Sequence, residues 1–241
     1  MPLLSIVIPA YNEAEFIGAL LQRILAVPTE PLGFEKELIV VDDGSKDKTA
    51  EIARGFAGVK VFTQVPNQGK GKAVQRGIRE SSGSYILIQD ADLEYDPMDY
   101  LALLRALGPK ADTVYGSRVL GQIRDKKGSR LFPGRHPDQS FGPWLAGQLL
   151  TLWTFLLYGK WISDTLTAYK LYPADAVRSM RVRTSGFETD HEITAKLIRG
   201  GHRIVEVPIA YFPRSVEAGK KIKPRDGFIA VWTLLKFRFV R

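Results

Sequence analysis

The chain has 241 residues, 45% of them hydrophobic, a formal net charge of +8 and no cysteine. This composition predicts a globular protein with a full core, and it excludes a disulfide framework, a thiolate metal site and a cysteine nucleophile. The positive charge favours anionic partners, namely nucleic acid, an anionic lipid surface or phosphorylated substrates.

The N-terminal residues 1–9 predict a first strand, because they lack the charged segment and the long apolar run of a signal peptide. We therefore expect a cytoplasmic protein. Apolar runs rich in β-branched residues then alternate with helical patterns. The expected strands are Leu4–Ile8, Leu38–Val41, Val59–Phe62, Tyr85–Ile88 and Thr113–Tyr115. The expected helices are Ala14–Ala26, Thr49–Phe56, Lys72–Arg79 and Met98–Leu107. This alternation predicts an α/β fold with a largely parallel sheet.

Acidic residues follow two of these strands: Asp42 and Asp43 after the second, and Asp90, Asp92 and Glu94 after the fourth. Parallel sheets place their ligands at the carboxyl ends of the strands. In an extended chain, residues two apart point the same way, so their carboxylates can share a cation. Hard oxygen donors at this spacing suit Mg²⁺ or Mn²⁺. The alternative is a solvated acidic turn ahead of the next helix.

Two further segments are candidates for nucleotide contacts. Residues 9–13, Pro-Ala-Tyr-Asn-Glu, leave the first strand and enter the first helix, where backbone N–H groups and the Tyr11 ring could meet a base or phosphate. The alternative is a plain junction with Asn12 preceding the helix. Residues 67–72 combine glycines and lysines but lack the spacing of a phosphate-binding P-loop. They predict either a backbone approach to a polyanion or an ordinary basic loop.

The second half begins with a glycine-, proline- and arginine-rich loop over 121–142, which we expect to be functional or mobile. Residues 143–158 form an apolar stretch of 16, shorter than the roughly 20 needed to span a bilayer. Residues 227–241 mix aromatic and aliphatic with basic side chains. Both predict amphipathic helices in the headgroup region of a membrane. The alternative is packing on the core or in a dimer interface.

Taken in order, the motifs at 5–13, 41–45, 67–71, 90–94 and 116–118 resemble those of family 2 glycosyltransferases with the GT-A fold. The resemblance is to the branch of dolichyl-phosphate mannosyltransferases and polyprenyl-phosphate glycosyltransferases. It continues through residues 164–170, 187–192 and 206–209. It divides the chain into a donor-binding half, 1–120, and an acceptor half, 121–241.

The resemblance implies inverting, metal-dependent transfer of a hexose from GDP-mannose or UDP-glucose to a polyprenyl or dolichyl phosphate. The enzyme would act as a peripheral protein on the cytoplasmic face of the membrane. A soluble or different lipid acceptor is the alternative. Nucleic acid is not expected as a partner, because it would explain the charge but not the acidic strand ends.

The resemblance implies a role for each residue that stands at a matching position of a family motif. The donor-binding residues are expected to be Pro9, Ala10, Tyr11, Glu13, Asp42, Asp43, Lys70 and Ala91. The metal ligands are expected to be Asp90, Asp92 and Glu94, and the catalytic residues Asp90, Asp92 and Arg118. The acceptor phosphate is expected to bind Arg118, Ser129 and Arg130, because the guanidinium fork binds phosphate bidentately. Arg124 or Arg135 could replace Arg130. Asp190 and Glu192 are the base candidates for a hydroxyl acceptor, or simply an acidic first helical turn.

Overall fold

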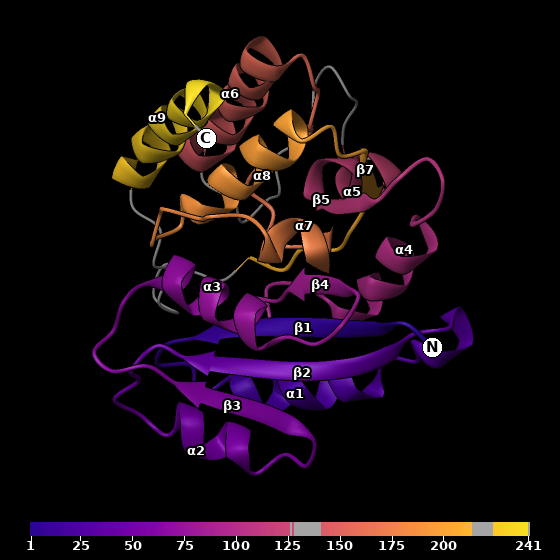
Figure 1. Ribbon diagram of the computed structural model, residues 1–241, viewed down its shortest axis with the longest axis vertical. Helices are drawn as coiled ribbons and strands as arrows, with labels where there is room; N and C mark the ends of the chain where they lie inside the picture. Colours follow the sequence, from indigo (N-terminus) through magenta and orange to yellow (C-terminus); the bar gives the residue numbers. More distant parts are fainter. Residues whose placement is uncertain (126, 128–140, 214–223, 241) are drawn as a thin grey trace.

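A seven-stranded sheet forms the centre of the computed structural model, which describes residues 1–125, 127, 141–213 and 224–240 (Figure 1). The strand order is β3-β2-β1-β4-β6-β5-β7. The strands are β1 Leu3–Ala10, β2 Glu35–Asp42, β3 Val59–Thr63, β4 Tyr85–Ile88, β5 Thr113–Ser117, β6 Lys170–Pro173 and β7 Ile204–Pro208. Strand β6 is antiparallel to both its neighbours, β4 and β5, whereas the other pairs are parallel. The predicted α/β class with a largely parallel sheet is therefore confirmed.

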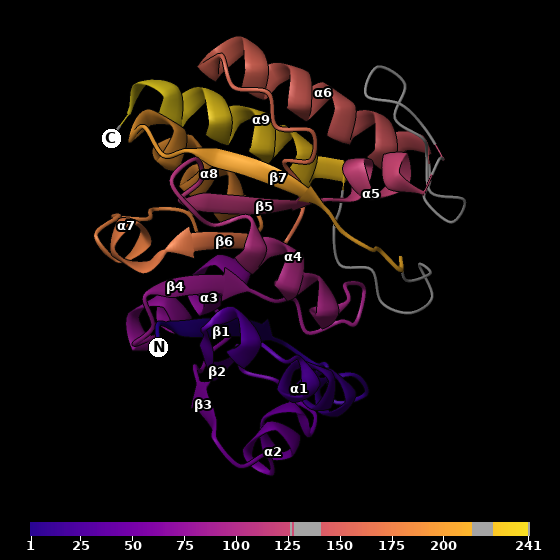
Figure 2. The same cartoon turned by 90° about the vertical axis from the view of Figure 1, so that its right-hand side faces the viewer.

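Helices cover both faces of this sheet (Figure 2). The helices are α1 Ile17–Ala26, α2 Thr49–Arg54, α3 Lys70–Glu80, α4 Tyr100–Arg105, α5 Arg118–Arg124, α6 Phe141–Tyr158, α7 Ala174–Arg178, α8 Thr189–Arg199 and α9 Pro224–Phe239. Short 3-10 turns lie at Glu30–Leu32 and Pro97–Asp99. Helices α1 and α4 contribute to the core on one face, and α3, α7 and α8 to the core on the other.

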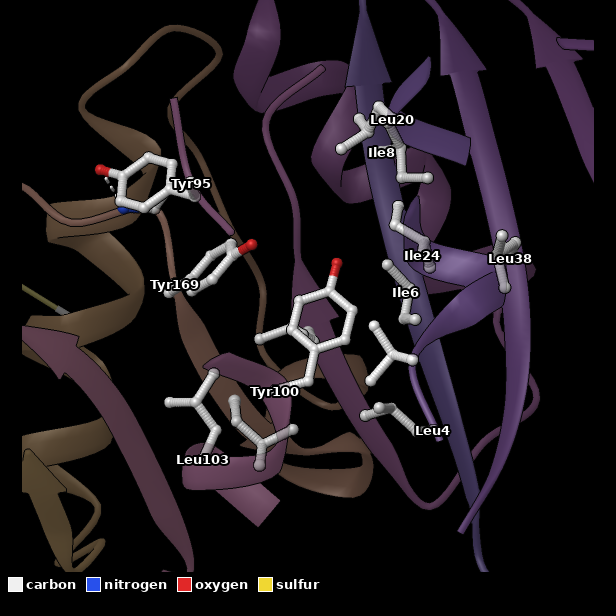
Figure 3. Packing of buried hydrophobic residues seen from close by; sticks show 14 of the residues in the cluster. Leu4, Ile6, Ile8, Leu20, Ile24, Leu38, Tyr95, Tyr100, Leu103 and Tyr169 are labelled. Carbon is white, nitrogen blue, oxygen red and sulfur yellow. Dashed lines mark hydrogen bonds between the residues drawn. The ribbon is translucent and has the colours of Figure 1, made fainter. Parts of the chain in front are cut away.

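The apolar run of β1 shows why the sheet is buried on both faces. Leu4, Ile6 and Ile8 belong to the core shared with α1, whereas Val7 packs with α3. Figure 3 shows Leu4, Ile6 and Ile8 beside Leu20 and Ile24 of α1. A strand with helices on both sides has no solvent face, so its sequence is largely apolar instead of alternating, with Ser5 as the buried polar exception.

The boundary of the first helix differs from the expected one. Helix α1 begins at Ile17, and Asn12 lies in a left-handed conformation, with φ 51°. Its backbone N–H donates to Ser45 Oγ at 2.9 Å, and its side-chain oxygen accepts from Lys46 N at 2.9 Å. Asn12 therefore joins the loops after β1 and β2 and does not cap α1. Gly44, in the loop after β2, has a positive φ of 73°.

Helices α6 and α9 lie side by side at the end of the molecule opposite α2 (Figures 1 and 2). Leu150 of α6 and Leu234 and Phe237 of α9 are buried together with Ala195 of α8. The exposed apolar side chains of the pair include Leu149, Leu152, Phe155, Leu156, Phe228 and Trp232. The helices expected within 143–158 and 227–241 correspond to α6, Phe141–Tyr158, and α9, Pro224–Phe239. An amphipathic character is not evident, because apolar side chains lie on both their packed and their exposed sides. Within the described ranges, no helix is long and apolar enough to cross a bilayer.

Candidate active site

The carboxyl ends of the parallel strands bring the predicted residues to one edge of the sheet. Ala10 ends β1 directly opposite Asp42, which ends β2. Asp90 follows β4, and Arg118 follows β5 at the first position of α5. Pro9, Ala10 and Ala91 are buried at this edge, and Tyr11 is partly exposed. Glu13 is also buried, and its N–H donates to Thr49 Oγ1 at 2.8 Å.

Asp42 and Asp43 are both buried but have different environments. Asp42 accepts one hydrogen bond, from Ser45 N at 3.2 Å. Asp43 Oδ1 accepts from the Gln64 side chain at 2.6 Å and from Gln68 N at 2.8 Å, and its Oδ2 accepts from Gly69 N at 2.8 Å. The carboxylate of Asp43 therefore anchors the segment 64–69, and its nucleotide contact stays a prediction. Asp42 keeps acceptor capacity at the strand end.

Lys70, the first residue of α3, forms an ion pair with Asp90, with 2.6 Å between Nζ and Oδ1. Burial alone would lower the pKa of Lys70, but the charges of Asp90, Asp190 and Asp92 outweigh burial and raise it. The lysine is therefore a permanent cation among carboxylates. Lys70 thus lies at the predicted donor edge.

Two glycines allow this arrangement. Gly69 has φ 94°, and a Cβ at Gly71 would lie 2.0 Å from Thr189 Oγ1. The start of α3 can therefore approach the start of α8, which carries Asp190. The glycine- and lysine-rich segment 67–72 brings two parts of the protein together, a consequence that the sequence alone did not indicate.

The three expected metal ligands do not converge as a set. Among the residues that the structure describes, no group of three His, Cys, Asp or Glu side chains could hold a metal ion. Asp90 pairs with Lys70, Asp92 Oδ1 accepts from Glu94 N at 3.2 Å, and Glu94 Oε2 accepts from the Tyr211 hydroxyl at 2.9 Å. The prediction of a three-carboxylate site is therefore not met by this geometry. Asp90 and Asp92 still fit Mg²⁺ or Mn²⁺, because such ions usually take one or two carboxylates and complete their shell with substrate phosphates and water.

Arg118 is held by Asp164 through both ends of its fork. Nε and Nη2 donate to the two oxygens of Asp164 at 2.7 and 2.8 Å, and the Arg118 backbone N–H adds a third bond at 3.0 Å. The guanidinium also stacks on Tyr211, 4.8 Å from the ring centroid. Burial would raise the pKa of Asp164, but Arg118 lowers it, so this carboxyl is ionised. Arg118 is thus already paired with Asp164. Its Nη1 makes no hydrogen bond with the described residues.

A pocket opens beside this pair. It is lined by Arg118, Val119, Gln122, Trp144, Gly147, Gln148, Ser163, Asp164, Leu166 and Tyr211. Glu206 of β7 supports its wall by accepting from the N–H and hydroxyl of Ser163, both at 2.8 Å, and from Asp164 N at 3.1 Å. Glu206 was not singled out from the sequence, although a charged residue within a short apolar strand is a usable signal.

The structure separates the two base candidates. Glu192 is fully buried and accepts hydrogen bonds from Arg183 N, from Thr184 N and Oγ1, and from Lys196 Nζ. These bonds give Glu192 a structural role. Asp190 lies in the first turn of α8 and acts electrostatically on Lys70, so it belongs to the candidate site.

Three tyrosines support the loop after β4 that carries Asp90, Asp92 and Glu94. The sequence did not indicate this support. Gln89 accepts from the hydroxyls of Tyr100 and Tyr169 at 2.5 and 2.7 Å, and its amide donates to Asp90 O at 2.8 Å. The ring of Tyr95 stacks on that of Tyr169 with 4.8 Å between centroids. Figure 3 shows Tyr95, Tyr169 and Tyr100 in a row leading towards β1. This packing fixes the backbone that carries Asp90.

The expected acceptor residues Ser129 and Arg130, and the alternative Arg135, lie outside the described residues. The other alternative, Arg124, is in α5 and pairs with its neighbour Asp125 at 3.0 Å. Of the acceptor-phosphate prediction, the structure therefore describes Arg118.

Comparison with known proteins places this chain in one family. Residues 5–153 match glycosyl transferase family 2, so the chain belongs to that family. It is 30% identical over 230 residues to the dolichol-phosphate mannosyltransferase of Pyrococcus furiosus, covering 93% of this chain and 60% of that protein. It is also 30% identical over 230 residues to the undecaprenyl-phosphate mannosyltransferase of Micrococcus luteus, covering 89% of this chain and 85% of that protein.

Solved structures support the fold. The crystal structure of glucosyl-3-phosphoglycerate synthase from Mycobacterium tuberculosis in complex with UDP is 18% identical, with a TM-score of 0.72 over 100% of this chain and 81% of that one. Other crystal structures of that synthase contain UDP with Mn²⁺ or Mg²⁺. At this identity the likeness establishes the GT-A-like fold alone.

Proposed function

We propose that the protein transfers a hexose, mannose or glucose, from a nucleoside diphosphate sugar to a polyprenyl or dolichyl phosphate, with inversion at the sugar carbon. The observation that carries the proposal is the meeting of Asp42, Asp90, Asp92, Lys70 and Arg118 at one edge of a family 2 glycosyl transferase fold. The relatives named above as mannosyltransferases of dolichol phosphate and undecaprenyl phosphate support the acceptor class.

On the donor side, Asp42 would accept hydrogen bonds from the ribose or base, beside Pro9, Ala10 and Tyr11. Asp90 and Asp92 would hold Mg²⁺ or Mn²⁺, which neutralises charge on the departing diphosphate. Lys70, already a cation at Asp90, would add positive charge near the same phosphates. Glu13 and Ala91 would shape the donor site from the loops after β1 and β4.

On the acceptor side, a lipid phosphate is ionised near neutral pH and needs no strong base. One of its oxygens attacks the sugar carbon from the face opposite the diphosphate, and the bond to the diphosphate oxygen breaks. Arg118 would orient this phosphate with its remaining donors, since a guanidinium keeps its charge and fits phosphate oxygens. Asp164 fixes the guanidinium, so little ordering is needed when the acceptor binds.

The apolar side chains that α6 and α9 expose would seat the protein on the membrane that contains the acceptor. Phe228 and Trp232 are 80% and 63% exposed. Aromatic side chains of this kind favour the headgroup region. We expect the protein to sediment with anionic vesicles, and the double substitution of Phe228 and Trp232 by serine to abolish this. Leu25→Ser, at an exposed apolar position of α1, is the matched control.

The direct test offers radiolabelled UDP-glucose and GDP-mannose with Mn²⁺, with and without a polyprenyl phosphate, and follows label into the organic phase. Label found there only when the lipid is present supports the proposal. Metal-dependent donor hydrolysis without labelled lipid would contradict it in favour of a soluble acceptor, and α6 and α9 would then be packing surfaces.

A further inference from the structure

Lys170 is a fully buried lysine at the active edge of the sheet. It is the first residue of β6 and pairs with Tyr115 of β5. Because β6 runs against its neighbours, its first residue lies at the edge where β4 and β5 end. The proposed function assigns no role to this side chain.

The contacts of Lys170 do not compensate its charge. Nζ donates to the backbone oxygen of Thr165 at 3.1 Å and stands 5.2 Å from the ring centroid of Tyr115. Unlike Lys60, Lys70 and Lys196, it forms no ion pair with a carboxylate in the described part of the chain. A buried ammonium in this position costs stability.

Burial lowers the pKa of Lys170, and two more distant carboxylates oppose this effect from different parts of the site. One is Asp190, which also acts on Lys70. The other is Asp164, the partner of Arg118. Lys170 therefore shares its electrostatic neighbourhood with the residues of both the donor and the acceptor side. In a buried environment such charges act over longer distances than in water.

Lys70 and Arg118 also act on Lys170, but each already pairs with a carboxylate of its own, Asp90 and Asp164. His191 is buried, and burial together with the Lys170 ammonium lowers the pKa of its imidazole to about 3, so the ring is neutral. The side-chain atoms His191 Nδ1, Thr165 Oγ1 and Tyr172 OH are buried without a hydrogen-bond partner among the described residues. These nearby side chains are polar and uncharged, so they add no further positive charge.

We propose that Lys170 is a positioning residue of the transfer site, whose buried ammonium offsets the charges of Asp190 and Asp164 so that an anionic acceptor can approach Arg118. This inference rests on the proposed function. Without Lys170, a phosphate acceptor would meet two carboxylates with less positive charge between them, and it would be repelled. The lysine would thus serve the charge balance of the site and not the stability of the fold.

The test compares Lys170→Met with Lys196→Met. The first replaces an uncompensated buried charge by an apolar side chain of similar length, which removes the cost of burying that charge. We expect an unchanged or higher melting temperature, a fall in kcat of about tenfold to a hundredfold, and a rise in the KM of polyprenyl phosphate. The KM of the donor should change less. Lys196 is paired with Glu192 at 2.6 Å, so its substitution should lower stability and leave the kinetics of the folded protein unchanged.

The outcomes separate the two proposals. If the wild type labels lipid and Lys170→Met does so with the same kcat and acceptor KM, the role of Lys170 is overturned while the function stands. If the wild type labels no lipid, the proposed function falls. A loss of stability in Lys170→Met as large as that in Lys196→Met would make the lysine structural, whatever the reaction.

Discussion

The two ends of the central sheet use carboxylates differently. Near the amino end, Glu37 of β2 accepts hydrogen bonds from Ser5 Oγ, from Ser82 N and Oγ, and from Lys60 Nζ. At the carboxyl end of the same strand, Asp42 accepts one, from Ser45 N. Both side chains are buried. The two carboxylates therefore differ in the number of donors that the described residues supply and not in burial, and the proposed function uses the one that keeps acceptor capacity.

The number of protein donors also distinguishes carboxylates at the edge of the sheet where Asp42, Asp90 and Arg118 lie. Asp43 and Glu192 stand in the motifs that resemble the family, yet protein donors surround both carboxylates. In this respect the carboxylates of Asp43 and Glu192 resemble that of Glu37. A motif can therefore contain one acid that keeps acceptor capacity, such as Asp42, and a neighbouring acid that builds the loop, such as Asp43.

The largest effect that this comparison predicts is that of Asp92→Asn. We expect a loss of turnover of about 10² to 10³, because the substitution removes charge that would hold the metal at the diphosphate. The measurement is transfer of radiolabelled hexose at saturating donor, Mn²⁺ and lipid. Asp175→Asn, at an exposed acid of α7, should retain wild-type turnover. Near-normal turnover of Asp92→Asn would contradict a role for Asp92 in holding the metal.

A smaller effect is expected for Arg118→Lys. A lysine cannot bind Asp164 bidentately or stack on Tyr211 in the same way, so the positive charge should be less well oriented. We expect the KM of the acceptor to rise about tenfold, the value of one lost charge-assisted contact, with little change in the KM of the donor. Steady-state kinetics with each substrate varied in turn would show this. An equal change in both KM values would contradict an acceptor-side role.

Much of the fold was predictable, because β1 to β5 are apolar runs separated by helical patterns. Strands β6 and β7 were not predicted. Strand β6 has only four residues and begins with Lys170, which hydrophobic patterning places at the surface. Its position between β4 and β5 depends on long-range pairing that no local pattern records.

The sequence predicted which residues of the candidate site lie at the strand ends, but not which side chains they contact. Sequence order places Asp42, Asp90 and Arg118 at one edge, since parallel strands end together. It does not show that Asp164 occupies the fork of Arg118 or that Tyr211 binds Glu94. These partners come from segments that meet only in the folded chain.

For Asp43→Asn we expect a loss of stability of about 1.5–3 kcal/mol, the range for hydrogen bonds to a charged group. The asparagine amide would face a backbone N–H of Gln68 or Gly69, and such donors cannot turn away. Urea denaturation gives the free energy of unfolding. Asp43→Asn should lower it more than Asp42→Asn, because the Asp42 carboxylate accepts one bond from the described residues. The reverse order would show that Asp43 is not the anchor of the 64–69 segment.

The smallest effect is expected for Glu37→Gln, at the opposite end of the sheet. Two of its donors are the hydroxyls of Ser5 and Ser82, which can rotate and accept from an amide. The Lys60 side chain is half exposed and can turn to solvent. We therefore expect a loss of about 1–2 kcal/mol at pH 7, near the lower end for charged hydrogen bonds, with kcat unchanged.

The pH dependence of this variant provides the sharper measurement. Burial would raise the pKa of Glu37, but the hydrogen bonds from Lys60, Ser5 and Ser82 lower it to about 2. A carboxyl whose pKa is depressed in the folded state stabilises the protein above its unfolded pKa of about 4.3, and it loses that contribution as the pH falls towards the folded value. The difference in unfolding free energy between wild type and Glu37→Gln should therefore be constant from pH 7 to about pH 5 and shrink below pH 4.3. A constant difference down to pH 2.5 would mean that Glu37 is not held as an anion by its donors.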